Sequence, residues 1–332
     1  MSQVVLLAAL GGRGCSKLVR LSSQANNSPD TSLFAFKGID FQTYLQNHDD
    51  EDELTHAEIE TWKRSSKMVA EMPPHPNIQP PPKMLVSVRS PTEKQEPIII
   101  GHLSAFYRKG DLRAHIETMN REGKRIPAQQ SARWCHQMSL AVDHTHRVMH
   151  TYHMDIKPAN IVLDDDDNII IIDWEQSGAP AITLAPEADG TWDVHEQHGK
   201  LVYIKYAGPP RRNRPEGSGK QGCHIWNVFP EWAVSCPRAS EQAEVFALGR
   251  TMWMLLSQTD DEFEEVEHPS DVQVSWGPAE ETLPRSWIEI VERCMDKDPN
   301  ERPSLAGLVK FWEMAESWEA KEVAVRKPVT ED

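Results

Sequence analysis

The stretch His153-Met154-Asp155-Ile156-Lys157-Pro158-Ala159-Asn160-Ile161-Val162-Leu163-Asp164 decides how the rest of the chain is interpreted. It places a carboxylate, an ammonium and an amide at fixed offsets, just before a short apolar run. A second apolar run, residues 169–172, ends at Asp173, and the polar residues between the two runs indicate a tight turn. The pattern predicts a β-hairpin that holds Asp155 and Asn160 before its first strand and Asp173 at the end of its second.

Two carboxylates and an amide around one point suit magnesium, which prefers hard oxygen ligands together with phosphate oxygens and water. Lys157 lies two residues after Asp155 and suits a phosphate group as a point-charge partner. The alternative is that Asp155 and Asp173 are ordinary solvated turn residues. The spacing, the intervening lysine and the second run that ends in aspartate favour a magnesium and phosphate site.

The same stretch resembles the catalytic loop of protein kinases, H-R-D-x-K-x-x-N, and Asp173-Trp174-Glu175 stands where the D-F-G motif follows it. The resemblance implies that Asp155 orients the substrate hydroxyl and accepts its proton, while Lys157 steadies the transferred phosphoryl group. It also implies that Asn160 and Asp173 hold magnesium. Glutamate in place of the motif's glycine is the main departure, and it puts catalytic activity in question.

The N-terminal part resembles the nucleotide-covering elements of the same family. Gly12, Gly14 and Val19 fit the glycine-rich loop G-x-G-x-x-G-x-V, although Lys17 stands where the third glycine belongs and a plain hairpin turn is the alternative. The alternating run 33–37 ends in Lys37 and resembles the V-A-I-K strand, whose lysine holds the α- and β-phosphates of ATP.

A helix is predicted over residues 55–72, before the His75-Pro76-Asn77-Ile78 turn, which resembles the H-P-N-I turn of kinases. By resemblance this helix supplies a glutamate that pairs with the strand lysine. Glu58 is our choice and Glu60 the second. Two strands, residues 84–88 and 97–103, follow, and the adenine-facing hinge is expected near Ser104-Ala105-Phe106-Tyr107, with Ala105 and Phe106 at its centre.

The C-terminal half carries the remaining kinase-like markers. Residues 244–249 resemble the start of a buried helix that is apolar on every side. Either Ala185-Pro186-Glu187 or Phe229-Pro230-Glu231 could correspond to the family's A-P-E motif, and the short spacing from Glu231 to that helix favours the second. We therefore expect Arg302, in the 296–303 marker, to form a buried ion pair with Glu231, at the end of a segment of more than fifty residues.

The motif order implies an α+β, two-lobed protein kinase-like fold, with a small β-rich N-lobe that holds one long helix and a mostly helical C-lobe. We place the N-lobe at 1–104, the C-lobe at 105–320 and a tail at 321–332. The net charge of −16 argues against nucleic-acid binding. The apolar run 4–10 is too short to span a membrane. Five cysteines without a C-x-x-C pair suit an intracellular protein, cytoplasmic or nuclear.

The resemblance implies ATP- and magnesium-dependent phosphoryl transfer to serine or threonine hydroxyls of protein substrates. Met154 replaces the family's arginine, which binds a phosphate on the activation segment, so we expect activity that does not depend on that phosphate. A pseudokinase scaffold that binds nucleotide or partners without efficient transfer is the alternative. A small-molecule kinase is a third reading, which the lysine at 157 and the A-P-E and Arg302 markers disfavour. The sequence leaves the oligomeric state open.

Overall fold

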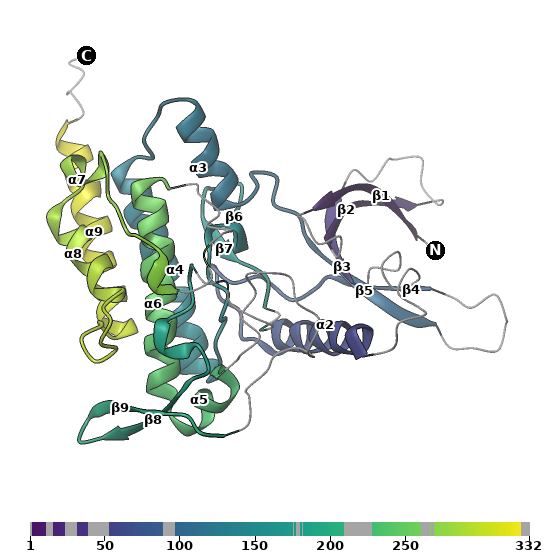
Figure 1. Cartoon of the computed structure of the whole chain (residues 1–332). Helices are drawn as coiled ribbons and strands as arrows, with labels where there is room; N and C mark the ends of the chain where they lie inside the picture. The colour runs from purple at the N-terminus through teal and green to yellow at the C-terminus, as the bar shows by residue number, and fades with distance from the viewer. Residues whose placement is uncertain are drawn as a thin grey trace, which may run out of the picture. The chain divides into compact units, whose positions relative to one another are not determined.

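The computed structural model describes residues 2–10, 16–23, 32–38, 53–88, 97–174, 176, 180, 182–208, 228–259, 266 and 269–326. The chain divides into two compact units, which are treated separately below. Unit 1 is Met1–Pro74 with Gln79–Arg108, and unit 2 is His75–Ile78 with Lys109–Asp332. The predicted α+β class is confirmed, with a five-stranded antiparallel sheet in the first unit and mainly helices in the second (Figure 1).

The sheet of unit 1 has the strand order β1-β2-β3-β5-β4, and every neighbouring pair is antiparallel. Side chains alternate between its two faces, so one face can bury apolar residues. Val19 and Leu103 lie in its core at 2% and 1% exposure. The strands are β1 (Ser2–Leu10), β2 (Ser16–Ser23), β3 (Leu33–Gly38), β4 (Met84–Val88) and β5 (Ile98–Ala105).

Helix α2 (Glu53–Glu71) supplies the second layer of unit 1. Its buried positions recur at helical spacing and direct one stripe of the helix inward. Two of its residues contact β5: the Trp62 ring stacks on the ring of His102 at 6.2 Å, and Ser66 Oγ lies 3.2 Å from His102 Nδ1. The helix ends before Pro73-Pro74, as expected of residues that cannot continue it.

Unit 2 is organised around α6 (Pro237–Ser257), which is buried on all sides along most of its length. The helix starts earlier than residue 244, where the sequence placed its start, because Pro237 occupies its first turn, where a missing N–H costs nothing. Around it lie α3 (Leu112–Arg121), α4 (Ala128–His144), α5 (Phe229–Ser235), α7 (Ala279–Thr282), α8 (Arg285–Cys294) and α9 (Leu305–Arg326). In the described part of the chain, no helix is long and apolar enough to cross a membrane.

Two small hairpins complete unit 2. The first joins β6 (Ile161–Leu163) to β7 (Ile169–Ile171) and follows the catalytic-loop stretch. The second joins β8 (Trp192–Gln197) to β9 (Lys200–Lys205) and precedes α5 and α6 (Figure 1). Its two strands were not predicted from the sequence.

Candidate functional site

The β6–β7 hairpin confirms the predicted pair of strands around a polar turn. Asp164 closes the turn, since its Oδ1 accepts hydrogen bonds from the backbone N–H groups of Asp166 and Asn168 at 3.0 and 2.7 Å. Because the aspartate side chain is short, it hydrogen-bonds readily to nearby backbone groups, and this favours a turn over continued strand pairing. The turn therefore fixes where the flanking residues, Asn160 and Asp173, leave the two strands.

Asp155, Lys157 and Asn160 form one hydrogen-bonded cluster. Lys157 Nζ and Asn160 Nδ2 lie 2.8 and 3.0 Å from Asp155 Oδ2, and Asn160 Nδ2 also donates to the Asp155 carbonyl at 2.8 Å. The other carboxylate oxygen, Asp155 Oδ1, is buried and accepts no hydrogen bond from the described residues. Such an atom is costly to leave unpaired, so it marks a place where a ligand donor fits.

The backbone places Asp173 beside this cluster. Ile172 N–H donates to the Asn160 carbonyl at 2.9 Å, and His153 Nε2 donates to the Ile172 carbonyl at 2.8 Å. Asp173 itself has a positive φ of 70°, which is uncommon for a residue with a side chain. Trp174 is fully buried, and its ring meets the His153 ring edge to face at 4.5 Å. The structure thus brings the residues around positions 155, 160 and 173 together.

Glu244, at the start of the apolar part of α6, was not assigned a role from the sequence. Its Oε1 accepts the backbone N–H groups of His153 and Met154 at 2.7 and 2.6 Å, and its Oε2 accepts from His146 Nε2 at 2.8 Å. Burial opposes ionisation, yet the hydrogen bond and charge of His146 hold the pKa of Glu244 below its ordinary value. The carboxylate anchors the start of the catalytic-loop stretch. The sequence signal that could have predicted this role is a single acidic residue, Glu244, directly before an apolar helical run.

Met154 has a φ of 76° and is 2% exposed. It belongs to an apolar cluster with Leu184, Ala185 and Phe229. The position where the family's arginine would bind a phosphate is therefore filled by apolar packing.

The predicted ion pair between Arg302 and Glu231 is wrong. Arg302 pairs with Glu187 through two bonds, Nη1 to Oε1 at 2.5 Å and Nη2 to Oε2 at 2.9 Å. Both side chains are almost fully buried, whereas Glu231 lies exposed on α5. Ala185-Pro186-Glu187 is thus the equivalent of A-P-E, and the segment from Asp173 ends at Glu187. The β8–β9 hairpin and α5 lie between Glu187 and α6, which explains why spacing to that helix misled the prediction.

In unit 1, Lys37 of β3 lies opposite His102 of β5, so both side chains share one face of the sheet. Burial, and then the Lys37 charge, lower the pKa of His102 to about 4. Val19 is buried opposite Phe34, and Ala105 pairs with Phe34 at the end of β5. Gly12 and Gly14 lie outside the described residues.

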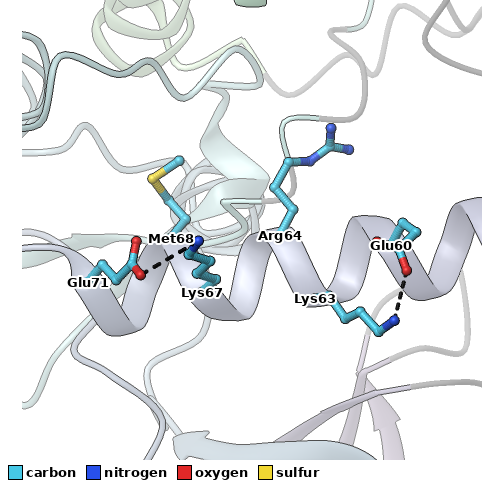
Figure 2. A pocket seen from close by; sticks show the side chains of 6 residues that line it. All are labelled: Glu60, Lys63, Arg64, Lys67, Met68 and Glu71. Carbon is cyan, nitrogen blue, oxygen red and sulfur yellow. Dashed lines mark hydrogen bonds and ion pairs between the residues drawn. The ribbon is translucent and has the colours of Figure 1, made fainter.

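Of the two candidate helix glutamates, the structure describes the side chain of Glu60 only. The Glu58 side chain lies outside the described residues. Glu60 accepts a hydrogen bond from Lys63 at 2.8 Å and is 66% exposed. Figure 2 shows Glu60 beside Lys63 in a hollow on α2, which is lined by Glu60, Lys63, Arg64, Lys67, Met68 and Glu71. The described α2 side chains that contact β5 next to Lys37 are Trp62 and Ser66.

Among the described residues, no group of three or more His, Cys, Asp or Glu side chains could hold a metal ion. The candidate oxygen ligands are instead the side chains of two aspartates, Asp155 and Asp173, and of Asn160. This set suits a magnesium ion that also binds phosphate oxygens.

Comparison with known proteins agrees with this geometry. The protein kinase domain family model matches residues 22–183, which include the Asp155 cluster and Asp173. This part of the chain is similar to a protein kinase domain. It is also 26% identical over 163 residues to the MAP kinase kinase kinase wis4 of Schizosaccharomyces pombe. That similarity covers 48% of this chain and 10% of the length of wis4. The α+β fold, with a five-stranded antiparallel sheet followed by a helical part, is that of a protein kinase.

Proposed function

We propose that this protein kinase transfers the γ-phosphoryl group of ATP, with magnesium, to serine or threonine hydroxyls of protein substrates. The observation that carries the proposal is the Asp155 carboxylate, which has one oxygen tied to Lys157 and Asn160 and the other buried without a partner among the described residues. The similarity to a MAP kinase kinase kinase supports a protein as the phosphate acceptor. Lys157, two residues after Asp155, supports the serine/threonine type by resemblance.

Asp155, Lys157 and Asn160 have different roles in the proposed reaction. Asp155 Oδ1 accepts the hydrogen bond of the substrate hydroxyl and then its proton, a contribution that is typically about 10²–10⁴-fold in rate. Lys157 holds the carboxylate in place through a bond of 2.8 Å and supplies positive charge to the phosphoryl group as it moves. Asn160 fixes the orientation of Asp155 through two hydrogen bonds from one amide nitrogen.

The residues present fit magnesium. Because Asn160 uses its amide nitrogen on Asp155, its side-chain oxygen remains for a cation, and Asp173 adds a carboxylate next to it in the fold. When bound, magnesium neutralises the developing charge on the phosphate oxygens. Asn160 and Asp173 are its proposed ligands.

The remaining roles are proposed from the resemblance. Lys37 holds the α- and β-phosphates of ATP, Gly12 and Gly14 cover them, and Val19 packs against the adenine. Ala105 and Phe106 hold the adenine edge through backbone groups. The described cysteines, 135, 236 and 294, are free and buried. Reduced thiols of this kind support an intracellular location, cytoplasmic or nuclear.

The test is magnesium-dependent transfer of phosphate from ATP to a generic protein substrate, by wild type and by Asp155→Asn, which keeps the volume of the side chain. We expect the wild type to transfer phosphate and the variant to lose transfer while it still binds ATP. Transfer that survives the substitution would contradict the assignment of Asp155 as the base.

A second function, a nucleotide-binding scaffold without efficient transfer, is favoured by one observation. Glu175 stands where the D-F-G motif has glycine, which places a negative charge two residues after Asp173. The same assay separates the two functions, because a scaffold binds ATP in both proteins and transfers phosphate in neither.

A further inference from the structure

The β8–β9 hairpin lies between Glu187 and α6, directly after the segment that starts at Asp173. Its register gives it two different faces. Val194 lies opposite Tyr203 and Glu196 opposite Leu201 on one face, whereas Ile204 belongs to the other. Val194 and Leu201 are 8% and 4% exposed, but Ile204 is 51% exposed. The hairpin therefore buries Val194 and Leu201 on its inner face, whereas Ile204 on its outer face meets solvent.

The inner face packs into the same apolar cluster as Met154, Leu184 and Ala185. The ring of Tyr203 meets that of Trp232 edge to face at 6.0 Å. Burial, and then the nearby Glu187 carboxylate, raise the pKa of Tyr203 above its ordinary value. The hairpin thus shares one apolar cluster with the end of the 173–187 segment and with Met154.

The loop that contains Asn300 and Arg302 binds both the hairpin and the end of the 173–187 segment. Asn300 accepts from Leu201 N–H at 2.8 Å and donates through Nδ2 to the Leu201 carbonyl at 3.0 Å. Two residues further on, Arg302 holds Glu187 through its two bonds. At the hairpin turn, Arg238 Nη1 donates to the Gly199 carbonyl at 2.5 Å. A strand edge that would otherwise be open is thereby closed by side chains.

We propose that the β8–β9 hairpin is an intramolecular clamp, which holds residues 182–188 and Met154 in the arrangement needed to position a protein substrate. This proposal rests on the proposed function, since it assigns the clamp to the substrate side of the transfer reaction. The clamp is held by burial of apolar surface and by hydrogen bonds to the backbone, and these interactions are always present. Met154 stands where the resembled family has its phosphate-binding arginine, and methionine supplies no cation for a phosphate.

Two variants loosen the clamp and one serves as a matched control. Asn300→Ala removes both bonds to Leu201, and Leu201→Ala shortens the buried side chain while leaving the Asn300 loop intact. Ile204→Ala makes a similar truncation on the outer face of the same strand. Hydrogen exchange is followed in peptides that cover residues 182–188, with α9 as the internal reference for global unfolding. The KM for a generic protein substrate and the affinity for ATP are measured with unphosphorylated protein.

We expect faster exchange of residues 182–188 in both loosened variants, unchanged exchange in α9, and no change in the control. The KM for the protein substrate should rise about tenfold or more, equivalent to about 1.4 kcal/mol, while the ATP affinity stays within about twofold. Unchanged exchange of residues 182–188 in both variants would overturn the clamp. Faster exchange with an unchanged KM would overturn its role in substrate positioning. A wild type that transfers no phosphate would refute the proposed function, and the exchange measurements would still decide whether the clamp exists.

Discussion

Arg302 and Glu187 form a two-bond ion pair across unit 2, with both side chains almost fully buried. Arg302 also donates from Nε to the Asp296 carbonyl and from Nη1 to the Gln242 carbonyl, at 2.9 and 3.0 Å. The guanidinium therefore joins the end of the 173–187 segment to its own loop and to α6. Planar, bidentate geometry of this kind is available to arginine and not to lysine.

Removal of one partner should destabilise the protein strongly. Arg302→Ala leaves the Glu187 carboxylate buried without its cation, which typically costs about 3–5 kcal/mol. We expect a marked fall in the melting temperature of Arg302→Ala and a similar fall for Glu187→Ala. Glu231→Ala, at an exposed site on α5, is the control and should melt within about 1 °C of wild type, as surface substitutions usually do. Equal losses in all three variants would contradict the assigned pairing.

Lys157 should matter for turnover more than for ATP binding. Its ammonium lies 2.8 Å from Asp155 Oδ2, and under the proposed function it also supplies positive charge to the transferring phosphoryl group. Lys157→Met keeps the length of the side chain and removes the charge. We expect kcat to fall about 10²–10³-fold, the range typical of one lost electrostatic contact to the transition state. ATP affinity, measured by calorimetry, should change little. A large loss of affinity at constant kcat would assign Lys157 to nucleotide binding instead.

Glu244 should position the catalytic loop by satisfying two backbone donors. Glu244→Ala leaves the N–H groups of His153 and Met154 buried without acceptors, at about 1–3 kcal/mol each. We expect lower thermal stability and lower kcat together. Glu244→Gln keeps an oxygen acceptor, so it should recover part of both losses. A Gln variant as damaged as the Ala variant would show that charge, and not acceptance of the two N–H groups, is the essential property.

Activity should not require phosphorylation of the 173–187 segment. Met154 is buried among apolar side chains, and the Thr183 side chain in that segment is 1% exposed. Phosphatase-treated protein should therefore retain the kcat of untreated protein. Met154→Arg should lower the melting temperature by burying a cation in an apolar cluster, without creating a dependence on phosphorylation. Loss of all activity after phosphatase treatment would contradict this prediction.

Unit 1 should lose stability as the pH falls. The pKa of His102 is about 4 in the folded protein, against 6.5 ordinarily, so the unfolded chain takes up this proton first. The contribution of neutral His102 is complete above about pH 6.5 and is lost progressively as the pH falls towards about 4. Melting temperatures at intervals from pH 7.5 to 4.5 should fall more steeply for wild type than for His102→Gln. Parallel curves would show that His102 does not contribute.

The local sequence was sufficient to predict the elements whose hydrogen bonds join residues that are close together in the chain. The β6–β7 hairpin and the grouping of Asp155, Lys157 and Asn160 were predicted because turn residues and strand alternation act over short distances. The α+β class followed from the resemblance of the motif order to that of protein kinases. The order of these motifs along the chain also implied the family that the comparison then identified.

Only the tertiary structure decided which distant residues meet. The sequence offers two Pro-Glu candidates for Arg302, and spacing chose the wrong one because the β8–β9 hairpin enters between Glu187 and α6. Likewise, the sequence does not show that Glu244 accepts the N–H groups of His153 and Met154, or that Trp62 and Ser66 of α2 lie beside His102. A buried charge must find its partner wherever the packed chain brings one, and the number of residues between the partners carries little information about that choice.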